Sequence, residues 1–523
     1  MLFLRFFSNF AASLDAKFIR ILVFWIVLQA GSAFASSSDQ KNPYSEIKDL
    51  SYLKFHQLFD DYINKNGLKD RYGFYNAKTS DLIRFLEQFV NLEKLRCGSF
   101  LRLFKVELEE FAKNPPRLPN LKTLVLIGDS SLHDLGWLVS YPSLESLTIY
   151  GYKEIDVAPL QAMEHLLDLN LLWGESNAKV VHANCLPLSL QSLHLDNCYI
   201  DPIELNHLKL KKLQLTSKYI TGLPEKLALA ELEYLNLSES SISNLSAIEG
   251  NQSLKVFVYS GPTRSGVKAN FSILNTLSNL EELVLVKFPQ RHEELGDAIN
   301  GLSKLQRLTL SGKKLFNLSC LEGLNLSELS TEGRLLNLIP DSILRNSSLT
   351  ALSTTELELL DSAFSWNQLS PNIRNLDLGY SDFCDFSELS RFPLTSLSCE
   401  DVDFINNEEQ LITFAPTLES LTCKGSTIYS VVNTYGDDIL ASFVKLKRLN
   451  IDFGENNKFN SLNFLKKLPL LEELEINSAR ELPPEAFNVF LEMKNLNNIT
   501  VFDETIDIYK KMQELLKNDI PIE

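Results

Sequence analysis

The chain has 523 residues, 45% of them hydrophobic, and carries 50 basic against 67 acidic side chains, for a net charge of −17. Nucleic-acid binding needs a basic face, so this balance argues against a nucleic-acid partner. The seven cysteines are an odd number without close terminal clusters, which excludes a disulfide framework.

Residues 1–35 read as a secretory signal. Arg5, Lys17 and Arg20 precede the apolar run ILVFWIVL at 21–28, and an Ala-Phe-Ala site at 33–35 follows. We therefore expect an exported protein, periplasmic or secreted, with no stable membrane span after cleavage. An uncleaved N-terminal anchor is the alternative, although the apolar run is shorter than the ~20 residues that a span needs.

Residues 36–91 are predicted to form a helical N-terminal cap. The segments SEIKDLSYLKFHQLFDDYI (45–63) and TSDLIRFLEQFV (79–90) have apolar residues at helical spacing, and each opens with a capping Ser or Thr. A stacked sheet exposes core at its first strand, so a cap is expected there. A separate binding module is the alternative.

A six-residue frame, Leu-x-x-Leu-x-Leu, organises the chain from residue 92 onward. PSLESLTI (142–149) returns almost unchanged as PTLESLTC (416–423), and eighteen frames follow one another at spacings of 20 to 29 residues. The frames begin at Leu92, Leu121, Leu144, Leu166, Leu190, Leu210, Leu232, Leu254, Leu280, Leu305, Leu326, Leu349, Ile373, Leu394, Leu418, Leu446, Leu471 and Leu496.

The fourth and sixth places of the frame alternate with polar neighbours, the pattern of a short strand with one buried face. One unit cannot bury that face alone, so neighbouring units stack and share a core. The pattern predicts a long parallel sheet over residues 92–503, about 18 repeats, with short helical or 3₁₀ turns on the outer side in segments such as 240–253 and 384–393. Residues 504–523 are predicted to close it with a C-terminal capping helix.

The frame and its spacing resemble those of the leucine-rich repeat superfamily, over roughly residues 92–501. The resemblance implies an α/β solenoid with a curved parallel sheet on the concave side and irregular, 3₁₀ or short helical segments on the convex side. The signal and the lack of cysteine-rich caps favour the bacterial exported type.

The chain departs from the family pattern at two places in the frame. The family usually has Asn or Cys at the ninth place, and among the eight units from Leu121 to Leu280 only Cys198 fits. This predicts an irregular solenoid whose buried turn groups find other partners. Tyr259, Thr331 and Thr354 replace the apolar sixth residue, which predicts kinks or breaks of register in those units.

The sequence offers one zinc-like constellation, made of His182, Cys185, His194 and Cys198. The frame places His194 fifth, facing out from the sheet, and Cys198 ninth, facing in. Because ligands on opposite sides of a sheet cannot converge, we expect no metal site. No cofactor is expected either.

Three further cysteines, Cys97, Cys399 and Cys423, occupy sixth places and should point into the core as small hydrophobes. Cys399 and Cys423 are in adjacent units, so a bridge between them is the lesser alternative.

Enzymatic chemistry has little support in the sequence. There is no phosphate-cradling glycine loop and no nucleophile elbow. Some bacterial proteins with such repeats add a cysteine-dependent ubiquitin ligase domain. Here Cys384 lies inside the repeats, and too little chain follows Val501 for such a domain. We expect no enzyme.

The open face of the sheet, formed by the third, fifth and seventh places, is the candidate binding surface. Apolar and aromatic side chains on a solvent-exposed face are typical of protein interfaces. The alternative is that the β-branched residues are there only because they favour strands. The candidate contact residues are Val125, Ile127, Tyr150, Leu172, Trp173, His194, Val258, Val284 and Val286. Later repeats are more acidic, which favours a basic partner. Their acidic residues on this face are Glu328, Glu332, Asp377, Glu400, Asp452, Glu473 and Glu475.

The sequence thus predicts a non-catalytic protein–protein interaction scaffold that binds a protein partner through the concave face as a monomer. An exported carbohydrate- or cell-envelope-binding surface protein is the alternative, since aromatic faces also stack on sugars.

Overall fold

The computed structural model describes residues 47–50, 79–97, 112–127, 134–151, 156–173, 179–223, 231–260, 270–288, 292–299, 301–312, 317–355, 366–379, 389–399, 408–452, 462–477 and 498–501, with isolated positions between them. The chain divides into two compact units: Met1–Leu254 with Pro262–Asn270, and Lys255–Gly261 with Phe271–Glu523. The predicted signal (1–35) and closing helix (504–523) lie outside the described residues. No helix among the described residues is both long and apolar enough to cross a bilayer.

The first unit is built on short parallel strands, each paired with the next along the chain. The strands are β1 (Asp49–Leu50), β2 (Lys94–Cys97), β3 (Thr123–Ile127), β4 (Ser146–Gly151), β5 (Asp168–Trp173), β7 (Ser192–Asp196), β9 (Lys212–Thr216) and β10 (Tyr234–Asn236). A second, small sheet pairs β6 (Lys179–Val181) with β8 (Cys198–Ile200).

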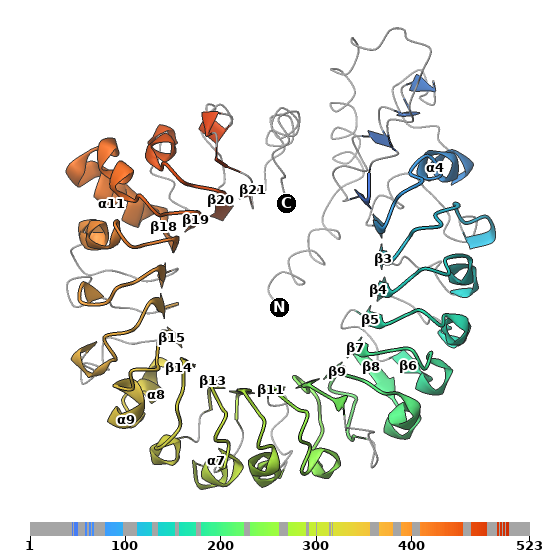
Figure 1. Ribbon diagram of the computed structural model, residues 1–523, viewed down its shortest axis with the longest axis horizontal. Coiled ribbons are helices and arrows are strands. Elements are labelled where there is room, and N and C mark those ends of the chain that lie inside the picture. The colour runs from blue at the N-terminus through green and yellow to red at the C-terminus, as the bar shows by residue number, and fades with distance from the viewer. Residues whose placement is uncertain are drawn as a thin grey trace. The chain divides into compact units, whose positions relative to one another are not determined.

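The fully described returning segments of the first unit are a helix and several 3₁₀ turns. They are α4 (Thr79–Leu86), η1 (Gly136–Ser140), η2 (Ala158–Ala162), η3 (Ala183–Cys185), η4 (Pro202–His207) and η6 (Ser246–Ile248). The strands lie on the inner side of the unit and the turns on its outer side (Figure 1). The prediction of a helical turn within 240–253 is confirmed by η6; residues 384–388 of the segment 384–393 lie outside the described residues.

The second unit repeats this arrangement, again with each strand paired to the next. Its strands are β11 (Val256–Ser260), β12 (Glu282–Val286), β13 (Arg307–Leu310), β14 (Glu328–Glu332), β15 (Ala351–Thr355), β16 (Asn375–Asp377), β17 (Ser396–Cys399), β18 (Ser420–Lys424), β19 (Arg448–Asp452), β20 (Glu473–Asn477) and β21 (Asn498–Val501).

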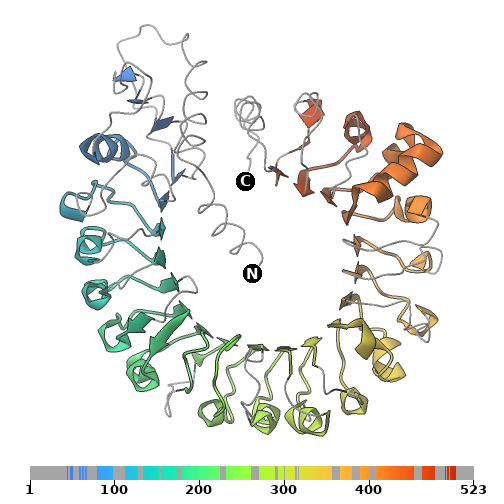
Figure 2. The same ribbon diagram turned by 180° about the vertical axis from the view of Figure 1, so that it is seen from behind.

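Helices and 3₁₀ turns cover the outer side of the second unit, as the view from behind also shows (Figure 2). The helices are α7 (His292–Ile299), α8 (Gly333–Leu336), α9 (Asp341–Leu344) and α11 (Gly425–Tyr435). The 3₁₀ turns are η7 (Phe271–Thr276), η8 (Ser319–Leu321), η10 (Trp366–Gln368), η11 (Glu408–Phe414), η12 (Asp437–Ser442) and η13 (Asn463–Lys467).

Strand register follows the frame in both units. Fourth-place leucines lie opposite one another, as in Leu124, Leu147 and Leu169, which are at most 2% exposed. In β7 the burial alternates: Leu193 and Leu195 are fully buried. Each of the two units is a leucine-rich repeat solenoid, and the predicted repeats and parallel strands are confirmed. Their cause is a period-two pattern whose apolar half each repeat buries against the next.

The repeats with Tyr or Thr at the sixth place keep the common register, so the prediction of a register error there is wrong, and the kinks stay a prediction. Tyr259 lies opposite Leu285, and Thr331 lies opposite both Leu310 and Thr354. The first and fourth leucines of these units remain, and slipping by one residue would turn them out of the core. The ring of Tyr259 contacts that of Phe271 edge-on, with centroids 4.9 Å apart.

Thr354 provides a test of this buried position. Its side chain is fully buried, and its hydroxyl has no hydrogen-bond partner within the described part of the chain. Replacing it with the isosteric valine should raise the free energy of unfolding by about 1 kcal/mol, because a buried, unsatisfied hydroxyl is removed. Urea unfolding measures this. Thr331→Val is the matched control, since the Thr331 hydroxyl has an acceptor in the Glu332 carbonyl at 3.4 Å and should gain less.

The turns after the strands are irregular, as the missing asparagine ladder predicts. Ser217 Oγ donates to the Cys198 carbonyl at 2.7 Å, and Ser240 Oγ donates to the Leu237 carbonyl at 2.8 Å. Local hydroxyls therefore satisfy buried carbonyls that a regular ladder would serve. The eighth place takes a left-handed conformation in several units, at Asn197 (φ 53°), Glu239 (φ 61°) and Lys287 (φ 54°).

The N-terminal segment differs in part from its prediction. Helix α4 confirms the helical expectation for 79–86 and buries Phe85, but the helix predicted over 45–63 is wrong at 49–50, where β1 pairs with β2. The backbone N–H groups of Glu93 and Lys94 donate to the Lys48 carbonyl at 2.7 and 2.9 Å. A helix at residues 49–50 would leave the edge of β2 without backbone hydrogen-bond partners. The exposed edge therefore favours a strand at 49–50. The capping role of 36–91 stays a prediction.

Candidate functional site

The open face of the first unit carries three rows of side chains that run across neighbouring strands. In-register pairing aligns the same frame place from unit to unit. The third-place row is Thr123, Ser146, Asp168, Ser192 and Lys212. The fifth-place row is Val125, Thr148, Asn170, His194 and Gln214. The seventh-place row is Ile127, Tyr150, Leu172, Asp196 and Thr216.

The seventh-place row brings together three of the six predicted contact residues of this unit. Tyr150 lies opposite both Ile127 and Leu172 on adjacent strands, and Val125 is two residues from Ile127 on β3. Val125, Tyr150 and Leu172 are half-buried, neither enclosed in the core nor fully exposed. Trp173 follows Leu172 on β5, but its side chain and that of Ile127 lie outside the described part. Partly exposed apolar groups on adjacent strands form a continuous contact surface.

A hydrogen-bonded network beside this row was missed by the sequence analysis. Asn170 Nδ2 donates to Thr148 Oγ1 at 3.2 Å and to Asp168 Oδ2 at 3.0 Å, and Ser146 Oγ donates to the same carboxylate oxygen at 3.0 Å. These contacts join β4 to β5. Reading the third and fifth places across units, rather than along one unit, would have placed these residues side by side.

His194, predicted as a contact residue, belongs to a second chain of polar groups. Thr216 Oγ1 donates to Asp196 Oδ1 at 3.0 Å, and His194 Nε2 lies 3.1 Å from Thr216 Oγ1. Since the one hydroxyl proton of Thr216 goes to Asp196, Nε2 is the donor to Thr216. This assigns the Nε2–H tautomer to His194 and leaves Nδ1 as an acceptor.

Burial shifts both titrating groups of this chain toward their neutral forms. It lowers the pKa of His194 to about 4, and the charge of Lys212 acts in the same direction. It raises the pKa of Asp196 to about 6, and the charge of Glu239 adds to this rise. At neutral pH the face therefore presents a neutral imidazole and a carboxylate that is costly to keep charged.

The predicted valine contacts of the second unit also lie together. Val258 lies opposite Val284 on β12, and Ser260 lies opposite Val286. The three valines are half-buried. A salt bridge borders them, with Arg307 and Glu282 joined at 2.9 Å.

The acidic stretch of the second unit is interleaved with basic residues. Arg448 lies opposite Glu473, and Lys424 lies opposite Asp452. Arg334 pairs with Glu332 at 2.8 Å. Glu400 lies outside the described residues. Neighbouring cations thus offset part of the charge that favours a basic partner.

The zinc-like constellation is divided as the frame predicts. His194 is half-buried on the open face, whereas the Cys198 thiol is fully buried, and burial raises its pKa to about 12. His182 Nδ1 lies 3.5 Å from Glu204 Oε1. Within the described ranges, no group of three His, Cys, Asp or Glu residues could hold a metal ion.

Cys399 and Cys423 lie opposite each other on β17 and β18 and point into the core, as predicted. Both are thiols in the structure, and Cys399 Sγ donates to the Thr422 carbonyl at 3.3 Å. The side chain of Cys97 lies outside the described part.

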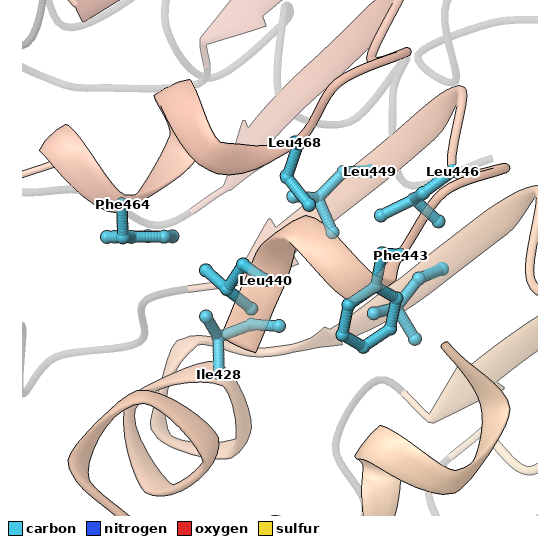
Figure 3. Close-up of a pocket in the computed structure, with 8 residues that line it drawn as sticks. Ile428, Leu440, Phe443, Leu446, Leu449, Phe464 and Leu468 are labelled. Atoms are coloured by element: carbon cyan, nitrogen blue, oxygen red, sulfur yellow. The ribbon is translucent and has the colours of Figure 1, made fainter. Parts of the chain in front are cut away.

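An apolar space lies between strands β18 and β19 and the helical segments α11, η12 and η13 of the second unit (Figure 3). Its volume open to a water-sized sphere is about 10 Å³, which is room for about one water molecule at most. Its lining is wholly aliphatic and aromatic and includes Ile428 of α11, Leu440 of η12 and Phe464 of η13. Without a polar group to orient a ligand, it is an interstice of the core.

No protein family and no curated protein matches this sequence. Solved structures do match. An internalin from Listeria monocytogenes is 16% identical, over 73% of this chain and 86% of the internalin, with a TM-score of 0.30. A leucine-rich repeat protein of Leptospira interrogans is 18% identical, over 80% and 98%, with a TM-score of 0.30. TLR13, solved as a complex with ssRNA13, is 18% identical, over 82% and 69%, with a TM-score of 0.36.

Proposed function

We propose that this protein is a non-catalytic interaction scaffold that binds a protein partner through the open face of its first unit. The observation that supports this most is the seventh-place row, where Tyr150 and Leu172 lie side by side on adjacent strands and remain partly exposed. Aromatic and apolar anchors of this kind supply most of the energy of protein interfaces. The predicted signal places the encounter outside the cytoplasm, in the periplasm or beyond the cell.

The chemistry of the face fits binding better than catalysis. His194 donates to Thr216, so its Nε2 is not available as a base, and Thr216 itself donates to Asp196. A nucleophile needs an adjacent base that accepts its proton and is free to pass it on. In this chain of hydrogen bonds the hydroxyl proton is already committed to a carboxylate.

Replacing Tyr150 with alanine should weaken binding of a partner about tenfold or more, because it removes an aromatic anchor from the centre of the row. A partner is first isolated by affinity capture on the purified protein, and its affinity is then measured by calorimetry. The free energy of unfolding should fall by less than about 1 kcal/mol, since the ring is only half-buried.

Tyr219→Ala is the matched control. Tyr219 is also a half-buried tyrosine of the first unit, but it lies in the turn after β9, where Lys218 covers its ring at 5.1 Å. Its loss should leave the affinity unchanged. Equal weakening by both variants, or loss of folding in Tyr150→Ala, would remove the row from the proposed interface.

A further inference from the structure

The apolar part of the seventh-place row runs directly into a carboxylate. Leu172 on β5 lies opposite Asp196 on β7, so the row passes in register from apolar side chains to one acidic group. All the described side chains of this row are half-buried. A segment laid across these strands would therefore meet an apolar surface first and an acid next.

The Asp196 carboxylate is incompletely satisfied. Oδ1 accepts from Thr216 at 3.0 Å, Oδ2 has a long contact, 3.4 Å, with Asn197 Nδ2, and the backbone N–H of Asn197 also donates to the carboxylate. An ionised carboxylate offers about four acceptor positions, so these three donors leave about one position open. Within the described residues, no lysine or arginine forms an ion pair with Asp196.

The charge that acts on Asp196 besides burial comes from Glu239, which follows β10 and raises the pKa of the Asp196 carboxyl further. Lys212 on β9 and Asp168 on β5 act instead on His194 of β7, which is neutral at pH 7. Lys212 Nζ lies over the Tyr234 ring at 5.1 Å. Within the described residues, the neighbouring charge that acts on the Asp196 carboxylate is therefore negative.

We propose that the partner contributes an arginine next to an apolar residue, with the guanidinium bound to Asp196 and the apolar side chain lying on Leu172 and Tyr150. This rests on the proposed function and names the chemistry of its partner. Arginine suits the position better than lysine, because its guanidinium is more weakly hydrated and can bind both carboxylate oxygens in a partly desolvated place. Binding a cation favours the ionised carboxylate, so association releases a proton when it occurs below about pH 6.

The test uses a phage-displayed library of random 12-residue peptides, selected on the full purified protein at pH 7.5. Selected peptides are synthesised and their affinities measured for four proteins: the unchanged protein, Tyr150→Ala, Asp196→Asn and Asp452→Asn. Asp452 is the matched control, since it is also a half-buried aspartate at the seventh place of its unit, on β19. Each affinity is measured at pH 7.5 and pH 5.

The expected peptides carry an arginine beside an apolar residue and lose about tenfold in affinity with Asp196→Asn at pH 7.5. Lowering the pH to 5 should weaken binding to the unchanged protein by a similar factor, and should leave binding to Asp196→Asn unchanged. Asp452→Asn should behave as the unchanged protein. Replacing the peptide arginine with citrulline, which keeps the shape without the charge, should reproduce the loss.

Two other outcomes separate the inference from the proposed function. Peptides that lose affinity with Tyr150→Ala, but lack basic residues and ignore Asp196→Asn, overturn the arginine assignment and leave the scaffold function standing. A selection that yields no peptide sensitive to Tyr150→Ala overturns both, because the row is then no binding surface.

Discussion

Replacing Leu171 with alanine should lower the free energy of unfolding by about 2–5 kcal/mol, whereas Leu172→Ala, one residue further along β5, should cost less than about 1 kcal/mol. Leu171 occupies the sixth place of its frame and is fully buried. Its truncation leaves a cavity between neighbouring repeats, and the packed core cannot close it. Leu172 is half-buried on the open face, and water fills the space that its side chain leaves.

Urea unfolding followed by circular dichroism measures both variants. The pair is an internal control, since the residue type, the strand and the substitution are the same and only the face of the sheet differs. Equal costs at the two positions would mean that the frame does not separate core from surface in this unit. The proposed binding row would then lose its foundation as well.

The fold could be predicted from the sequence because the frame has both a period and a spacing. The period of two tells which residues of each strand are buried, and the 20–29-residue spacing tells which strands are neighbours. The pairing of Leu124 with Leu147 follows from these two facts alone. The wrong prediction of a register error at Tyr259 came from treating the sixth place as equal in importance to the first and fourth places, whose leucines fix the register. A single polar or aromatic residue does not change register when two leucines still fix it.

Other features were beyond the reach of the pattern. Strand β1 consists of Asp49 and Leu50 alone, and two residues carry no periodicity. Their pairing depends on the exposed edge of β2, a tertiary feature that overrides the helical spacing around them. Short elements at the ends of a repeat array are therefore where local sequence and structure disagree.

The candidate site was predicted in outline only. The frame correctly aligned Tyr150 with Leu172 across β4 and β5. The same comparison of seventh places would have added Asp196 to the row, but the frame could not show that its carboxylate is half-buried. Nor can a pattern give the burial and hydrogen bonds that shift a pKa, since these depend on neighbours about 20 residues away, such as Thr216.

Asp196→Asn should raise the free energy of unfolding at pH 7 by about 1–2 kcal/mol, with the gain disappearing below about pH 4. The pKa of Asp196 rises from an ordinary 3.8 to about 6 in the folded protein. A carboxyl with a raised pKa binds its proton more tightly when folded, so stability falls as pH rises from about 4 to about 6 and stays lower above that. The full shift would correspond to about 3 kcal/mol, and partial exposure of the group reduces it. Asparagine keeps the shape and carries no charge.

His194→Gln provides the opposite case, and urea unfolding from pH 4 to pH 8 measures both variants. The pKa of His194 falls from 6.5 to about 4 on folding, so this residue costs stability as pH falls through that interval, and its replacement should help only below about pH 6. In the unchanged protein the two effects oppose each other between pH 4 and pH 6. Asp196→Asn should therefore lose stability more steeply on acidification than the unchanged protein does. A parallel profile would show that Asp196 is not held in a costly charged state. A steeper one, combined with weaker peptide binding, would show that the protein gives up stability at this position to keep a carboxylate available for its partner.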